Sequence, residues 1–146
     1  MTIVPLPYES QAKSGFTHKI NITHADLTAA ATTETIELLT APAGGVVRKV
    51  AFRVNTAFDG GVTSTMTLQV GDGVDPNRYV TAQVVHVDGT EILSWIESNA
   101  TDSAPYSYVA ADTVDALFTA TGANVSVLTA GDMDIYVQIF DLDDLG

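Results

Sequence analysis

The feature that most constrains this chain is a period-two alternation of apolar and polar residues in several short segments. The clearest are Thr113–Gly122 and Met133–Leu142, with Val46–Asn55 and Phe16–Thr23 further upstream. Successive side chains of a β-strand point to opposite faces, so each segment fits a strand with one buried face. We find no convincing helical pattern on the order of twelve residues or longer. The chain is therefore predicted to be all-β.

Weaker patterns and turn residues complete this prediction. Turn-forming residues such as Ala41–Gly45 separate the apolar segments. About eight short strands with regular turns are typical of an antiparallel β-sandwich, jelly-roll-like in form. The weaker elements are strands at Thr33–Thr40 and Thr63–Gly71, a strand or short helix at Tyr79–Val87, an apolar segment at Ile92–Ile96, a short extra strand at Val125–Leu128, and a brief helical turn with Asp26 as N-cap.

The alternation also predicts which side chains fill the core. In Val46–Asn55, Arg48 would share the apolar face, while Lys49 and Arg53 would lie on the opposite face. The residues expected in the core are Phe52, Val54, Leu68, Val70, Leu117 or Phe118, Ile135, Val137 and Ile139.

The N-terminal residues differ from the rest of the chain. Pro5 and Pro7 favour extended geometry and discourage helix, so residues 1–15 are predicted to form an extended arm before a single β-sandwich domain at 16–146. The N-terminus does not resemble a signal peptide, and no apolar stretch is long enough to span a bilayer. We therefore expect a soluble protein made in the cytoplasm, with no membrane partner.

Charge excludes one large class of function. The net charge is −12, and residues 79–146 contain eleven acidic side chains with no Lys or Arg. Nucleic-acid binding requires cations that neutralise phosphates, so DNA and RNA are not expected partners. The six basic residues all lie in residues 1–78. Lys49 and Arg53, together with the arm containing Pro5 and Pro7, are candidates for docking on a partner protein, although a simply solvated basic face is the alternative.

The sequence offers one weak metal candidate. Asp72, Asp75 and Asn77 lie in a glycine-containing loop and have oxygens that a hard cation such as Ca²⁺ prefers. The spacing is not that of an EF-hand, and the same residues are selected by any tight turn, which is the interpretation we favour. The acidic cluster of Asp141, Asp143 and Asp144 is interpreted as a solvated tail.

No catalytic constellation or cofactor motif is found. The chain has no Cys, and its three histidines, His18, His24 and His86, are not spaced as zinc ligands. A Gly-x-Ser-x-Gly nucleophile motif and nucleotide-binding glycine patterns are absent. Paired carboxylates could occur among 18 acidic residues, but Trp95 is the only tryptophan available for a sugar-binding cleft. A carbohydrate-active or metal-dependent enzyme is thus a remote alternative, and the prediction is no enzyme and no cofactor.

From Gly71 onward the chain resembles small structural proteins of tailed bacteriophage virions, notably head decoration (auxiliary capsid) proteins. The resembling segments cover about half of the chain and are Gly71–Pro76, Ala111–Gly122 and Leu128–Leu142. The resemblance implies a β-sandwich, a location on the virion, self-association and contact with the major capsid protein. By analogy with three-fold capsid sites, the oligomer is expected to be a homotrimer.

The resemblance does not separate head from tail. A tail, neck or receptor-binding fibre component is the alternative within the virion. A fibre tip would be expected to expose aromatic side chains, and the candidates in this chain are Trp95, Tyr106 and Tyr108.

Overall fold

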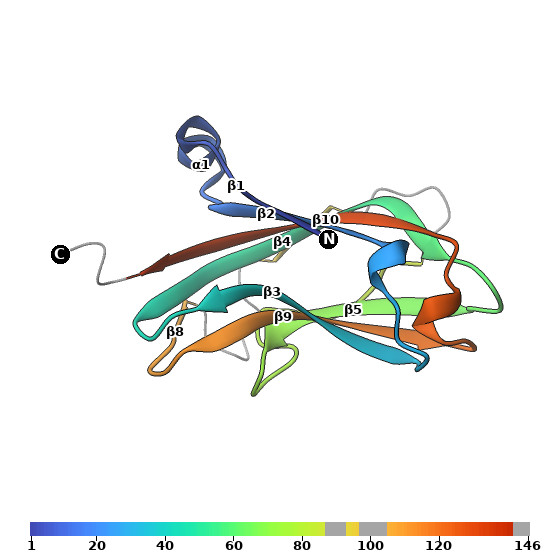
Figure 1. Ribbon diagram of the computed structural model, residues 1–146. Coiled ribbons are helices and arrows are strands. Elements are labelled where there is room, and N and C mark those ends of the chain that lie inside the picture. The colour runs from blue at the N-terminus through green and yellow to red at the C-terminus, as the bar shows by residue number, and fades with distance from the viewer. Residues whose placement is uncertain (87–92, 97–104, 142–146) are drawn as a thin grey trace.

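The computed structural model describes residues 1–86, 93–96 and 105–141, with the backbone alone for 93–96. Two antiparallel sheets pack face to face as a sandwich, and one short α-helix lies beside the larger sheet (Figure 1). The predicted fold class, an all-β antiparallel sandwich, is confirmed.

The larger sheet contains strands from both ends of the described chain. Its spatial order is β1-β2-β10-β4-β7, with the short strand β8 also pairing with β4. The last long strand therefore lies between the second and the fourth. The bounds are β1 Thr2–Pro5, β2 His18–Thr23, β10 Ala130–Asp141, β4 Gly45–Asp59, β7 Leu93–Ile96 and β8 Tyr106–Ser107.

The smaller sheet has the order β3-β9-β5-β6. Three short helices complete the described part of the chain. The strand bounds are β3 Thr33–Ala41, β9 Asp112–Thr121, β5 Thr65–Asp72 and β6 Val80–Val84, and the helices are α1 Tyr8–Ser14 with the 3₁₀ turns η1 His24–Asp26 and η2 Val125–Val127.

The core lies between the two sheets and follows the predicted alternation. Its members form one continuous cluster, in which Phe58 of β4 meets Phe118 of β9 with ring centroids 5.5 Å apart. Phe118, rather than Leu117, is the residue that points inward, and Ile139 is only partly buried. The other expected core residues are confirmed: Phe52, Val54, Leu68, Val70, Ile135 and Val137.

The prediction for Arg48 was wrong because β4 contains a β-bulge. Lys49 pairs with Gln138 but Val47 pairs with Ile139, so one extra residue, Arg48, is inserted in β4. A bulge of this kind reverses the alternation beyond it. Arg48 is consequently exposed, and Val47 is fully buried in its place.

The N-terminal segment is not extended throughout. Residues Thr2–Pro5 form β1, which pairs with β2 at the edge of the larger sheet, but residues Tyr8–Ser14 form helix α1. The expectation that the prolines would discourage a helix was wrong, because Pro7 is the N-cap of α1 and proline is well tolerated where a helix begins. The helix ends at Gly15, which adopts φ = 74°.

Two local predictions were also wrong. Asp26 is the third residue of η1 and not its N-cap; Thr23 occupies the cap, and its backbone N–H donates to Asp26 Oδ2 at 2.9 Å. This reciprocal arrangement is a capping box, which the Thr–x–x–Asp spacing permits. The short strand expected at Val125–Leu128 is the 3₁₀ turn η2, in which Val125 is buried.

Candidate interaction surface

The Asp72 loop is built around one buried carboxylate. Asp72 is 3% exposed, and its Oδ1 accepts hydrogen bonds from the backbone N–H groups of Val74 at 3.1 Å and Asp75 at 2.8 Å. Its Oδ2 accepts hydrogen bonds from Arg78 Nε and from the Tyr108 hydroxyl, the latter at 3.2 Å. Each oxygen of Asp72 thus accepts two hydrogen bonds from this chain.

The other metal candidates are part of the same turn. Asp75 Oδ1 accepts a hydrogen bond from the backbone N–H of Asn77 at 3.2 Å. The loop folds back onto β5 at Gly71, where a Cβ would collide with the backbone of Asp75 and Pro76. Among the residues that the structure describes, no group of three His, Asp or Glu side chains is placed to hold a metal ion.

The aromatic side chains near this loop are part of the packing. The hydroxyl groups of Tyr79 and Tyr108 are hydrogen-bonded to each other, and burial raises the pKa of both. Tyr106 packs edge-on against Tyr108, and Arg78 lies 3.8 Å from the centre of the Tyr106 ring. Tyr108 is 4% exposed and so does not fit the expected exposed ligand site, while the side chain of Trp95 lies outside the described residues.

The histidines lie apart from one another. His18 Nδ1 is 2.9 Å from Thr17 Oγ1, and burial lowers the pKa of His18. His86 Nδ1 is 2.6 Å from the carbonyl oxygen of Phe58, at the far end of β4. His24 belongs to the capped turn η1.

Lys49, one of the docking candidates, fastens α1 to the sheet. Its ammonium donates a hydrogen bond to the carbonyl oxygen of Ser14 at 2.8 Å and lies 4.5 Å from the centre of the Phe16 ring. At the other end of α1, Gln11 Nε2 donates to the carbonyl oxygen of Leu6 at 2.6 Å. These contacts hold a helix that has no buried residue of its own.

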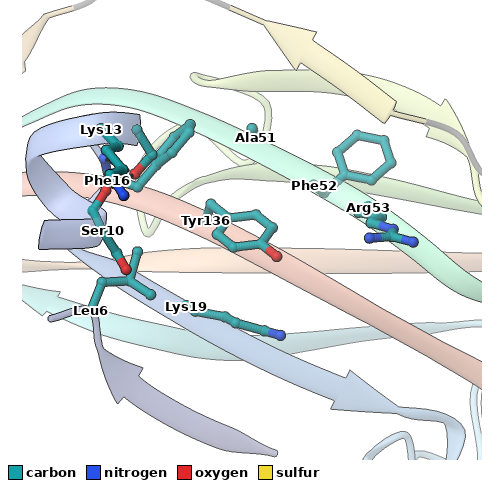
Figure 2. Close-up of a pocket in the computed structure, with 10 residues that line it drawn as sticks. Leu6, Ser10, Lys13, Phe16, Lys19, Ala51, Phe52, Arg53 and Tyr136 are labelled. Carbon is teal, nitrogen blue, oxygen red and sulfur yellow. Dashed lines mark hydrogen bonds between the residues drawn. The ribbon is translucent and has the colours of Figure 1, made fainter.

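A groove, which we call the α1 groove, lies between α1 and the outer face of the larger sheet (Figure 2). Its volume is about 720 Å³. The walls are apolar at Leu6, Phe16 and Tyr136, and the rings of Phe16 and Tyr136 are 5.8 Å apart. The lining residues are Leu6, Ser10, Lys13, Ser14, Phe16, Lys19, Ala51, Phe52, Arg53 and Tyr136.

The charged side chains among the described lining residues of the α1 groove are all basic. Lys13, Lys19 and Arg53 are among its lining residues, and none of those residues is acidic. Of the sequence-predicted docking residues, Arg53 lines the groove, Lys49 anchors its helical wall, and Pro5 and Pro7 flank Leu6 in the segment leading to that wall.

Lys19 is held in place beside the groove by Asp134. Their ion pair measures 2.9 Å between Lys19 Nζ and Asp134 Oδ2, and this hydrogen bond raises the pKa of Lys19. Burial alone would raise the pKa of Asp134, which is 6% exposed, but hydrogen bonds from Lys19, Asn55 and Asn21 outweigh it and hold the pKa below its usual range. Lys19 therefore carries its positive charge at neutral pH.

Sequence reasoning missed the aromatic part of this surface. Tyr136 is an outward position of β10, between the polar residues Asp134 and Gln138, and an aromatic residue there was the available signal. Phe16 is the first residue of the strand predicted at Phe16–Thr23, but it precedes β2 and packs against Tyr136.

Comparison with known proteins gives a fold and no family. No family model matches the sequence, and no curated protein matches it. The structure is similar to a chain of the cyanophage Pam1 capsid asymmetric unit, with a TM-score of 0.54, 20% sequence identity, and coverage of 85% of this chain and 81% of that chain. The two chains share a fold. Among the described residues, no helix is long and apolar enough to cross a membrane.

Proposed function

We propose that this protein is a non-enzymatic structural component of a tailed-phage virion, and specifically a decoration protein bound to the outside of the head. The observation that carries the proposal is the similarity of nearly the whole chain to a chain of a phage capsid asymmetric unit. The decoration role is further supported by the acidic character of the chain, which disfavours contact with the packaged DNA.

The two outer faces of the sandwich differ in a way that supports an orientation on the particle. The outer face of the larger sheet carries Lys19, Lys49 and Arg53, together with the α1 groove. The outer positions of β5 and β9 in the smaller sheet are Thr65, Thr67, Gln69, Asp115, Leu117 and Thr119. We assign the larger sheet to the contacts with other capsid proteins and the smaller sheet to solvent. Self-association as a homotrimer at three-fold positions is part of this proposal.

Analysis of purified particles tests the assignment. Mass spectrometry of virions should detect the protein, and cryo-electron microscopy should place it on the outer surface of the head. A location on the tail, neck or fibre would contradict the decoration role and retain the virion role. Absence from the particle would contradict both.

A binding experiment tests the orientation. Particles stripped of the protein are mixed with the wild-type chain, with a chain lacking residues 1–15, or with Arg53→Glu. Both altered chains should occupy fewer sites than the wild type. Thr67→Glu, which adds a negative charge on the smaller sheet, is the control and should bind normally. Equal occupancy by all four proteins would show that the larger sheet is not the contact face.

A further inference from the structure

The chemistry of the α1 groove specifies the kind of segment that it can bind. The apolar walls at Phe16 and Tyr136, with Lys13, Lys19 and Arg53 also in the lining, fit an extended segment that combines aliphatic and acidic side chains. Within the described residues Lys13 makes no ion pair, and it lies on the exposed side of α1. A groove of about 720 Å³ is within the range that binds ligands.

The chain itself contains such a segment. Beyond Asp141, where β10 ends, the sequence continues as Leu142-Asp143-Asp144-Leu145-Gly146. It places two leucines beside two adjacent carboxylates and contains no cation. Charge and apolar character both complement the α1 groove. We propose that the C-terminal segment 142–146 of one copy binds in the α1 groove of a neighbouring copy.

The length of the segment favours a second copy over the same chain. Arg53 pairs with Asp134, which precedes Asp141 by seven residues on β10. At about 3.4 Å per residue, this separation is roughly 24 Å along the strand. Five extended residues span at most about 18 Å. Within its own chain the segment can therefore reach the α1 end of the groove, where Gly15 lies beside Gln138, but cannot extend to Arg53. The segment of a neighbouring copy can lie along the whole groove.

This contact would also define the assembly. The groove and the segment are different surfaces of the same chain, so the interface is heterologous and runs from head to tail. Such an interface closes into a ring when a whole number of the rotations between neighbouring copies makes one full turn. The contact forms in solution without a capsid, so its test is independent of the proposed role on the particle.

Cross-linking between two different copies tests the proposal directly. Because the chain has no native Cys, each introduced thiol is unique. A tagged Ser10→Cys chain, with its thiol on the groove wall, is mixed with an untagged Gly146→Cys chain under mild oxidation. The control is a tagged chain that carries Ser126→Cys, at an exposed position on η2, in place of Ser10→Cys. The mixed disulfide should form at least about tenfold faster with the Ser10→Cys chain than with this control.

Charge reversal identifies the interaction behind the cross-link. Lys13→Glu in the groove chain, or Asp143→Lys with Asp144→Lys in the tail chain, should each slow the mixed cross-link by about threefold to tenfold. Combining the two reversed chains should restore the rate, since the charges are again complementary. Ala12→Glu with Ser126→Glu changes the net charge as much as Lys13→Glu but lies outside the groove lining, and it should have no effect.

Three results would overturn the proposal. The Ser10→Cys chain could react no faster than the Ser126→Cys chain. The charge reversals could leave the rate unchanged. A chain carrying both Ser10→Cys and Gly146→Cys could form its disulfide only within itself at every concentration, which would place the segment in its own groove and exclude a neighbouring copy.

Discussion

At the scale of single residues, Asp72 determines the conformation of the loop that follows β5. It is almost fully buried and accepts hydrogen bonds from two backbone N–H groups, from Arg78 and from Tyr108. Removing one partner of a buried ion pair leaves the other charge uncompensated, which costs about 3–5 kcal/mol. We predict that Asp72→Ala lowers the free energy of unfolding by this amount in urea titrations.

Asp75→Ala is the matched control for Asp72→Ala. The Asp75 side chain accepts one hydrogen bond, from Asn77, and its loss should cost about 1 kcal/mol. A chelator should change neither value if the loop is held by its own hydrogen bonds. Destabilisation of the wild type by chelator, abolished in both variants, would instead indicate a bound cation.

Asp115 should make stability fall as the pH rises. The side chain is 7% exposed, its Oδ1 has no hydrogen-bond partner among the described residues, and burial together with the negative charges of Glu37, Asp112 and Asp72 raises its pKa. The stabilising contribution of the protonated form is present below the unfolded pKa, about 3.9, and is lost as pH rises through the higher folded pKa. Asp115→Asn should therefore have a higher urea midpoint than the wild type at pH 7, and this advantage should shrink toward pH 3.

Asp134 should show the opposite dependence on pH. Its pKa is lowered in the folded protein by hydrogen bonds from Lys19, Asn55 and Asn21. The contribution of the ionised carboxylate is present above the unfolded pKa and is lost as pH falls through the lower folded pKa. Asp134→Asn should lower the urea midpoint at pH 7, with the deficit disappearing in acid. Parallel pH curves for the two variants would contradict both assignments.

At the scale of secondary-structure elements, α1 depends on contacts at its C-terminal end. Seven residues without a buried side chain are too few for a stable isolated helix. Gly15 has φ = 74°, and a Cβ there would lie 2.8 Å from the Lys49 ammonium that holds Ser14. Left-handed geometry costs a non-glycine residue roughly 1–2 kcal/mol.

We predict that Gly15→Ala loosens α1 without unfolding the sandwich. Amide hydrogen exchange over residues 8–14 should become roughly 5- to 30-fold faster, which corresponds to that energy. The thermal midpoint of the sandwich should change little. Ser10→Ala, on the same helix but with no contact to Lys49, serves as the control. Unchanged exchange in Gly15→Ala would show that Lys49 and Gly15 do not set the stability of α1.

The elements also show which features the sequence could predict. Periodicity identified β4, β5, β9 and β10 because one face of each packs on the core and the alternation records that burial directly. It failed at Arg48 because a bulge depends on the pairing with β10, which local sequence does not specify. It failed at α1 because a helix of seven residues is too short to leave a recognisable pattern. The α1 groove was missed because its walls come from α1 and from strands that are far apart in the sequence.

At the scale of the whole molecule, the two sheets share one core and should not unfold separately. Phe118 of β9 packs against Phe58 of β4 across the sandwich, and the buried residues of both sheets form one cluster. Small single-core proteins generally unfold in one cooperative step. Phe118→Ala removes a fully buried ring at the centre of this contact and should cost about 3–5 kcal/mol.

That loss is large relative to the total stability of a domain of this kind, about 5–15 kcal/mol. We predict that Phe118→Ala shifts the whole thermal transition to lower temperature, with far-ultraviolet and near-ultraviolet circular dichroism changing together. Thr119→Ala, the next residue on the outward side of β9, should leave the transition within about 0.5 kcal/mol of the wild type. Separate far- and near-ultraviolet transitions in Phe118→Ala would mean that one sheet can persist without the other. The two sheets would then unfold independently, and the shared core would not couple their stability.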